Sequence, residues 1–348
     1  MMDWSGLLGH DRQRQWFQHA VQQGRLASTF LFVGPSGIGK RTFAHLIAKS
    51  LLCTTHPPEA FSPCGHCEAC MQVAAGTHPD VIAIQREEDK SNLSIDQFVG
   101  DKDARMQEGL CYELRLKPYS GRRRIAIVDD ADTLAAEGAN SLLKTLEEPP
   151  PGSLIFLIGT SEQRQLRTIR SRSQIVRFHP LSESQLATLI LRQGWAQSEE
   201  EALQIARESD GSMDLAKLAI EESWRTLRQH LNAELRRCPI DFPKLGKTLL
   251  DHVNDAGTEG QARREQLKSI LDCAIEVYRT ALRESLGVRG ENRDAAHTTS
   301  RLSEQLDAPT LVSLIQRTQT VRDCVDRNIS PAALIETWVA DVASLSRA

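Results

Sequence analysis

Residues 34–41, with the sequence GPSGIGKR, come close to the pattern that binds nucleotide phosphates. In the pattern G-x-x-x-x-G-K-[S/T], backbone N–H groups cradle the phosphates, the lysine reaches them, and the final hydroxyl holds Mg²⁺. Arg41 stands where that hydroxyl is required, and in a helix turning about 100° per residue the hydroxyl of Thr42 points away from the metal. The sequence therefore predicts a degenerate nucleotide-binding loop and puts binding of ATP and Mg²⁺ by this chain in doubt. The loop keeps its glycines and its lysine, at Gly34, Gly37, Gly39 and Lys40.

The segments on either side of this loop have the character that the motif requires. Residues 29–33 form a short apolar run rich in β-branched and aromatic side chains, which is typical of a buried parallel strand. Phe43, Ile47 and Leu51 recur at i, i+4 and i+8 and predict a helix after the loop. The order strand, loop, helix favours a phosphate loop over the alternative, a glycine-rich turn with a chance lysine.

Residues 124–130, with the sequence RIAIVDD, are a second candidate for the same site. An apolar strand that ends in acidic residues resembles the Walker B element, in which the first Asp, here Asp129, orients Mg²⁺ and its water. The residue after it is usually a Glu, and this chain has the shorter Asp130. The alternative is a core strand that runs into an acidic turn.

Four of the eight cysteines lie close together in the spacing C-x10-C-x2-C-x2-C. Four thiolates at such spacing fit a closed, tetrahedral, structural Zn²⁺ site without an open position for catalysis. Gly65 lets the backbone turn between two of the ligands. The alternative is a fortuitous cysteine-rich loop; the four remaining cysteines are isolated and are interpreted as buried small side chains. The predicted ligands, in a module at 53–70, are Cys53, Cys64, Cys67 and Cys70.

Length and composition limit the class of protein. A chain of 348 residues predicts two or three domains, and 40% hydrophobic residues suffice for a sizeable core. A formal net charge of −4 argues against a dedicated nucleic-acid-binding protein. Because the N-terminus lacks a signal pattern and no run of 18 apolar residues occurs, we expect a soluble, cytoplasmic protein with no membrane partner.

Strands and helices alternate as far as about residue 180. Further strands are expected at 80–84, 154–160 and 174–178, with a helix from Thr133 that ends at three prolines and another helix reaching about Arg170. This alternation predicts an α/β fold with a doubly wound parallel sheet. Beyond it only amphipathic helices are expected, among them 266–286 and 311–327, with a break at 287–295.

Together these motifs resemble the AAA+ clamp-loader subunits of bacterial DNA polymerase III. The phosphate loop and the cysteine cluster contribute, as do residues 76–80 (GTHPD), 140–150 (NSLLKTLEEPP) and the element Ser171-Arg172-Ser173. The resemblance implies an AAA+ domain at 1–180, a helical lid at 181–221 and an all-α oligomerisation collar at 222–348. It also implies partners: gamma/tau motor subunits, a delta subunit, the sliding clamp and, indirectly, primed DNA.

The same resemblance assigns roles to single residues. Residues 7–10 would lie near the adenine, Thr160 at the sensor-1 position, and Arg172 would act in trans as an arginine finger on a neighbour's ATP. A planar guanidinium suits a γ-phosphate better than an ammonium does. The alternative for Arg172 is a surface salt bridge.

Departures from the family pattern separate two kinds of subunit. Motor subunits carry Thr, Glu and Arg where this chain has Arg41, Asp130 and Asp214. These changes favour a stator of the delta-prime type, which helps to load the clamp during DNA replication and has no intrinsic ATPase activity. The alternatives are an active clamp-loader ATPase of the gamma/tau type and an unrelated P-loop kinase.

Overall fold

A computed structural model describes residues 3–87, 90, 92–105, 107–120, 122–134, 136–235, 241–257, 260–287, 302, 305–325 and 329–345. By its internal contacts the chain divides into two compact units, residues 1–216 and 217–348. The predicted boundaries of three domains at 180 and 221 stay predictions. No helix in the described part of the chain is both long and apolar enough to span a membrane.

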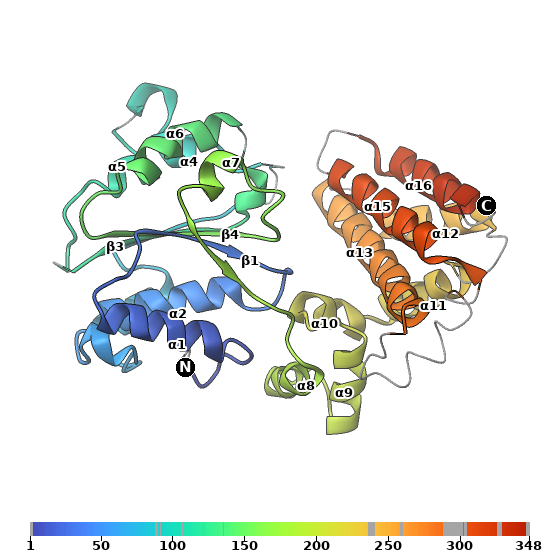
Figure 1. The fold of residues 1–348 in the computed structure, drawn as a ribbon, viewed down its shortest axis with the longest axis horizontal. Helices are drawn as coiled ribbons and strands as arrows, with labels where there is room; N and C mark the ends of the chain where they lie inside the picture. Colours follow the sequence, from blue (N-terminus) through green and yellow to red (C-terminus); the bar gives the residue numbers. More distant parts are fainter. Residues whose placement is uncertain are drawn as a thin grey trace. The chain divides into compact units, whose positions relative to one another are not determined.

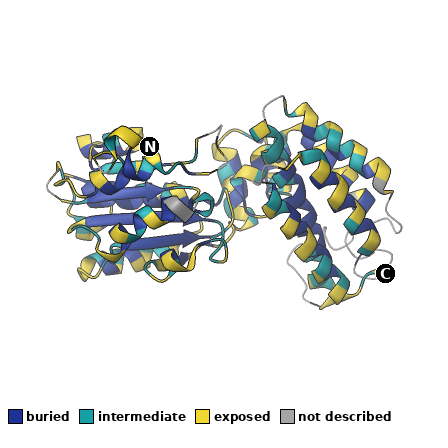
Figure 2. Ribbon diagram, turned by 90° about the horizontal axis from the view of Figure 1, so that it is seen from above, coloured by how far each residue is buried: buried dark blue, intermediate teal, exposed yellow. Residues whose placement is uncertain are grey.

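The first unit is built on a five-stranded parallel sheet with the order β2-β3-β4-β1-β5. Every residue of the three central strands is buried, which explains why these strands are continuous apolar runs in the sequence. Figure 2 shows the same strands as a buried layer. The predicted α/β fold with a parallel sheet is confirmed. The strands are β1 (Thr29–Val33), β2 (Val81–Ile84), β3 (Arg124–Val128), β4 (Ser153–Gly159) and β5 (Gln174–Arg177).

Helices cover both faces of this sheet, as Figure 1 shows. On one face α1 (Asp11–Gln22) and α2 (Lys40–Leu52) enclose an aromatic cluster around Phe17, Phe43 and Phe156. The opposite face holds a second apolar cluster. Its helices are α4 (Asp96–Val99), α5 (Leu110–Glu113), α6 (Ala136–Glu147) and α7 (Arg167–Arg170), while α3 (Glu68–Ala75) belongs to the cysteine module.

Two expected helices differ from the structure. The helix expected from Thr133 is preceded by a separate 3₁₀ turn at Ala131–Thr133, and α6 proper spans Ala136–Glu147. The helix expected to reach Arg170 is only the single turn α7, because residues 160–166 form a loop. That loop is held by hydrogen bonds from Thr160 and Gln165 to Asp132. A tertiary contact overrides local helix propensity there.

Three short helices complete the first unit and lead out of it: α8 (Glu183–Arg192), α9 (Glu199–Arg207) and α10 (Met213–Ile220). Ser182 forms a capping box with Gln185, which fixes the start of α8. Asp210 and Gly211 have φ of +46° and +74°, and this turn separates α9 from α10. The Oγ of Ser212 then accepts a hydrogen bond from the backbone N–H of Leu215.

The second unit is a bundle of helices around one apolar core. Trp338 is fully buried in this core and donates from Nε1 to Thr318 Oγ1 at 3.0 Å. The predicted helices 266–286 and 311–327 correspond to α13 and α15, whereas residues 288–295, 326–327 and Cys238 lie outside the described residues. The described helices are α11 (Glu222–Leu235), α12 (Phe242–Asp255), α13 (Gly260–Ser285), α15 (Ala308–Cys324) and α16 (Pro331–Leu345).

Candidate functional sites

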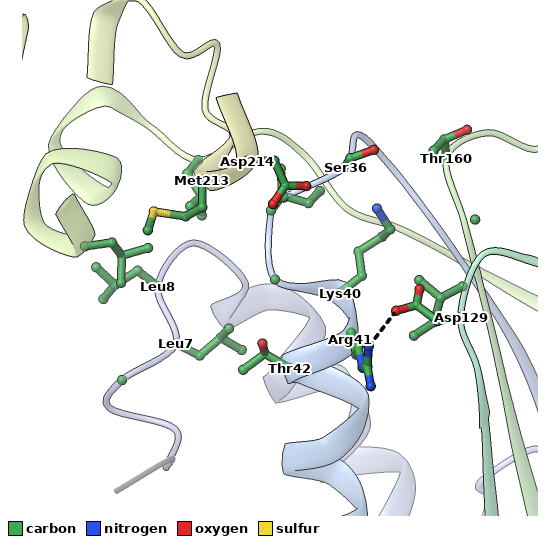
Figure 3. Close-up of a pocket in the computed structure, with 18 of the residues that line it drawn as sticks. Leu7, Leu8, Ser36, Lys40, Arg41, Thr42, Asp129, Thr160, Met213 and Asp214 are labelled. Atoms are coloured by element: carbon green, nitrogen blue, oxygen red, sulfur yellow. Dashed lines mark ion pairs between the residues drawn. The ribbon is translucent and has the colours of Figure 1, made fainter. Parts of the chain in front are cut away.

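A pocket of ≈ 600 Å³ lies at the carboxyl ends of the central strands in the first unit. Its walls come from the segment before α1, the phosphate loop, the residues after β3 and β4, and the start of α10 (Figure 3). The sequence-predicted residues that line it are Gly37, Gly39, Lys40, Arg41, Thr42, Asp129, Asp130 and Thr160. Gly34 lies at the start of the loop, whereas Arg172 and the four cysteines lie elsewhere.

The phosphate loop is closely packed, and its glycines are required. Gly37 and Gly39 have φ of +68° and +92°, values that favour glycine. A Cβ on Gly34 would lie 2.5 Å from the carbonyl oxygen of Phe178. Any larger residue at these positions would therefore distort the loop.

Lys40 is turned toward the carbonyl groups of its own loop. Its Nζ donates to the carbonyl oxygens of Gly34 at 2.7 Å and Pro35 at 2.5 Å. The residue is only 7% exposed, and this burial lowers the pKa of Lys40 to about 8. The ammonium group would have to leave these carbonyls to reach a phosphate.

Arginines lie beside both predicted Walker B carboxylates. The Nη1 of Arg41 is 3.6 Å from Oδ2 of Asp129, and the Nε of Arg86 is 3.8 Å from Oδ2 of Asp130. Thr42 lies on the Leu7 side of α2, away from Asp129 (Figure 3). Guanidinium groups thus stand close to where the pattern places Mg²⁺.

Sequence analysis did not identify Arg86 and Asp132 as residues of this site. Arg86 follows β2, and only the pairing of β2 with β3 reveals that it is close to Asp130. Asp132 accepts hydrogen bonds from the backbone N–H of Thr160 at 2.6 Å and from its hydroxyl at 2.5 Å. The hydroxyl at the expected sensor-1 position is therefore bonded within the chain.

The start of α10 adds a negative charge beside the loop. The backbone N–H of Met213 donates to the carbonyl oxygen of Gly37 at 2.9 Å. A Cβ on Gly37 would lie 2.7 Å from Cγ of Asp214, so the Asp214 carboxyl group is in contact range of the loop (Figure 3). A carboxylate at this place repels a phosphate, whereas an arginine would attract it.

The segment at residues 7–10 borders the same pocket. Leu7 and Leu8 line it with apolar side chains. His10 is 2% exposed, and its Nε2 hydrogen-bonds the carbonyl oxygen of Ile38 at 2.6 Å. Burial lowers the pKa of His10, which favours the neutral imidazole.

Arg172 follows α7, at the end of its one turn. Its Nη2 donates to Oε1 of Glu147 at 2.5 Å. Its Nη1 donates to the carbonyl oxygen of Thr168 at 3.1 Å and to Oγ of Ser171 at 3.2 Å. The side chain remains 32% exposed, so the guanidinium is both held and accessible.

The four cysteines form one cluster whose sulfur atoms all lie within 4.8 Å of one another. The Sγ–Sγ distance is 3.9 Å both for Cys53 with Cys67 and for Cys64 with Cys70. A tetrahedron with metal–sulfur bonds of about 2.3 Å has edges of about 3.8 Å, so the cluster can hold a metal ion.

The surroundings of the cluster suit thiolate ligands. Backbone N–H groups of His56, Cys67 and Cys70 donate to Sγ of Cys53, Cys64 and Cys67 at 3.3–3.4 Å. Burial opposes ionisation of Cys67, yet hydrogen bonds from Thr54 and the Cys70 N–H lower the pKa of this thiol to about 5. The Nη1 of Arg122 donates to the carbonyl oxygen of Cys53 at 2.5 Å and anchors the cluster to the segment before β3.

Comparison with known proteins assigns the chain to a family. The family described as "DNA polymerase III, delta subunit" matches residues 9–182. The chain belongs to this family. It is 36% identical over 146 residues to "DNA polymerase III subunit delta'" of Pseudomonas aeruginosa, covering 42% of this chain and 41% of that protein. It is 28% identical over 328 residues to "DNA polymerase III subunit tau" of Bacillus subtilis, covering 89% and 56%.

A gamma subunit-related protein from Thermotoga maritima has a TM-score of 0.38 at 17% identity, covering 96% of this chain and 100% of that one. The chain spans about half the length of the delta' relatives it matches: the matched regions cover 41%, 49% and 58% of those proteins. The expected clamp-loader family of DNA polymerase III is confirmed. Relatives named delta' and relatives named gamma/tau both match, so similarity leaves the subunit type open.

Proposed function

We propose that this clamp-loader subunit is of the delta-prime type, a stator with little or no ATPase activity of its own. The observation that carries the proposal is the pair of contacts Arg41–Asp129 and Arg86–Asp130. In an ATPase these carboxylates orient Mg²⁺ and its water. Here each carboxylate already has a cationic neighbour, so a divalent cation would have to displace it.

Two further features support loss of turnover. Lys40 bonds to carbonyl groups of its own loop, and Asp214 brings a negative charge to the place where phosphates would lie. The residues that would bind the metal ion and the phosphates, Lys40 included, thus all differ in their contacts from the pattern of an active ATPase. A subunit that hydrolyses ATP needs them together, whereas a stator does not.

The contribution of the stator to catalysis would be Arg172, donated in trans to the ATP site of a gamma/tau-type neighbour. An arginine finger neutralises charge that develops on the transferred phosphoryl group. The guanidinium of Arg172 is 32% exposed and lies outside its own chain's pocket, as this role requires. In a cytoplasmic complex with gamma/tau and delta subunits, it would help to load the sliding clamp on primed DNA.

The metal we propose for the cysteine cluster is structural Zn²⁺. Four thiolates leave no open coordination position, which excludes a catalytic role for the ion at this site. Bound Zn²⁺ would hold the module of residues 53–70 against the end of α2.

A second candidate is an active ATPase of the gamma/tau type, which the match to the Bacillus subtilis tau subunit over 89% of this chain favours. Hydrolysis by the purified chain separates the two candidates. The stator predicts no release of phosphate from ATP with Mg²⁺ and primed DNA above the background. Steady turnover by the isolated chain would establish the gamma/tau candidate instead.

The role in trans is tested with Arg172→Ala in the complex assembled from this chain and its gamma/tau and delta partners. We expect normal assembly but slower ATP hydrolysis and clamp loading, with poor rescue by Arg172→Lys because an ammonium lacks the planar fork. The finger is worth about 10³–10⁵ at a site that depends on it alone, so the complex should lose the activity of one site. Arg167→Ala, on the exposed side of the same turn, is the matched control. Full hydrolysis and loading by the Arg172→Ala complex would refute the role.

A further inference from the structure

The guanidinium of Arg172 sits in a cradle built from two separate helices. Oε1 of Glu147, the last residue of α6, accepts from Nη2 at 2.5 Å. The carbonyl oxygen of Thr168, in α7, and Oγ of Ser171, just after it, accept from Nη1 at 3.1 Å and 3.2 Å. Bonds to both terminal nitrogens fix the plane of the group as well as its position.

Both sides of this cradle are attached to the core. Glu147 directly follows Leu146, which is 4% exposed, and Arg172 is three residues after Ile169, which is fully buried. Leu146 and Ile169 belong to the same apolar cluster. The spacing between the backbones of Glu147 and Arg172 is therefore set by core packing.

The cradle leaves part of the guanidinium available. Arginine has five N–H donors in a rigid fork. Three of them are engaged by the acceptors above, and the Nε hydrogen and the second Nη2 hydrogen have no acceptor among the described residues. Two donors on a fixed plane can meet two oxygens of a phosphate.

We infer that Glu147 is a positioning residue for Arg172: its carboxylate holds the guanidinium in the orientation in which it meets the phosphate of a neighbouring subunit. This inference rests on the proposed function, because it needs Arg172 to act in trans. Glu147 does not touch the phosphate itself. It reduces the conformational freedom that the arginine would otherwise lose when the two subunits meet.

A contact that only masked Arg172 would have the opposite effect on ATP hydrolysis when it is removed. A mask would bind the donors that the phosphate needs, and its removal would increase hydrolysis. Glu147 binds one of the two Nη2 hydrogens and leaves a donor pair, so its removal decreases hydrolysis. The acceptor matters more than the charge, since an amide oxygen at the same place can accept the same hydrogen bond.

The experiment measures ATP hydrolysis and clamp loading by the complete complex assembled with the full chain. The variants are Glu147→Ala, Glu147→Gln, Arg172→Ala and the double variant Glu147→Ala with Arg172→Ala. Glu148→Ala is the matched control, because Glu148 is the exposed neighbouring residue and its side chain makes no hydrogen bond or ion pair within the described chain. Gel filtration and melting of the chain confirm assembly and folding.

We expect Glu147→Ala to slow the site served by Arg172 by about threefold to tenfold through kcat, with the KM for ATP unchanged. Glu147→Gln should retain most of the activity, Glu148→Ala all of it, and the double variant should be no slower than Arg172→Ala. Unchanged or faster hydrolysis with Glu147→Ala, beside a clear loss with Arg172→Ala, overturns the inference and leaves the proposed function intact. No loss with Arg172→Ala overturns both.

Discussion

Replacing Arg41 with threonine should allow the pocket of the first unit to bind a divalent cation. Arg41 contributes one positive charge 3.6 Å from Asp129, the carboxylate that the Walker B pattern assigns to Mg²⁺. Threonine removes that charge and adds the hydroxyl that the phosphate-loop pattern requires. Both changes favour the metal, so affinity for a divalent cation should increase.

The charge effect alone sets a lower limit on the increase. A divalent ion and a guanidinium about 4 Å apart repel by about 2 kcal/mol even at the dielectric constant of water, which corresponds to about thirtyfold in affinity. The Arg41 side chain is 48% exposed, so the dielectric constant of water is the relevant limit. Because the contact is exposed, its loss should lower the free energy of unfolding by no more than about 1 kcal/mol.

Titration with Mn²⁺, followed by electron paramagnetic resonance of the free ion, measures this affinity without nucleotide. Arg41→Lys keeps the charge and is the matched control, and Arg41→Ala separates the effect of the charge from that of the hydroxyl. We expect Arg41→Thr to bind at least about thirtyfold more tightly than Arg41→Lys, with Arg41→Ala between them. Equal affinities for Arg41→Thr and Arg41→Lys would show that the guanidinium does not exclude the metal.

Two further predictions concern the cysteine cluster and Lys40. The purified chain should contain about one Zn²⁺, and Cys67→Ser should remove this ion and lower the melting temperature. The control Cys324→Ser should leave both the zinc content and the melting temperature unchanged. Elemental analysis and melting curves check this, and a zinc-free chain whose melting is unchanged by Cys67→Ser would contradict it. Burial lowers the pKa of Lys40 to about 8 from an ordinary 10.5. Between these two pH values the unfolded chain binds more protons than the folded chain does. The free energy of unfolding should therefore increase by up to about 3 kcal/mol from pH 8 to pH 10.5. Lys40→Met should lack this increase in denaturant titrations, and equal pH dependence of both proteins would refute the shift.

The sheet could be predicted from the sequence because its central strands are buried on both faces. Continuous apolar runs such as residues 124–128 and 154–158 permit few structures other than a covered parallel strand. The phosphate loop could also be predicted, because its glycines adopt backbone angles that other residues avoid. Local rules failed for the loop after Thr160, where hydrogen bonds to Asp132 replace helical ones.

The side chains that contact the candidate residues could not be predicted from the sequence. Arg86 lies 44 residues before Asp130 in the sequence, and Glu147 lies 25 residues before Arg172. Each pair meets only because β2 lies beside β3 and because α6 ends beside α7. The sequence indicates which residues carry charge, while tertiary packing decides which charges are neutralised.

This distinction explains why the acidic residues after β3 are compatible with the proposed exclusion of metal from the site. Three carboxylates within four positions, Asp129, Asp130 and Asp132, repel one another unless positive or hydrogen-bonding groups compensate them. In an ATPase Mg²⁺ supplies part of that compensation. Here it comes from Arg41, Arg86 and the donors at residues 160 and 165. These groups therefore compensate the carboxylates in the turn after β3, where Asp130 has φ of +52°. Removing Arg41 should therefore leave the Asp129 carboxylate without its neighbouring positive charge, and a divalent cation is the group best suited to replace that charge.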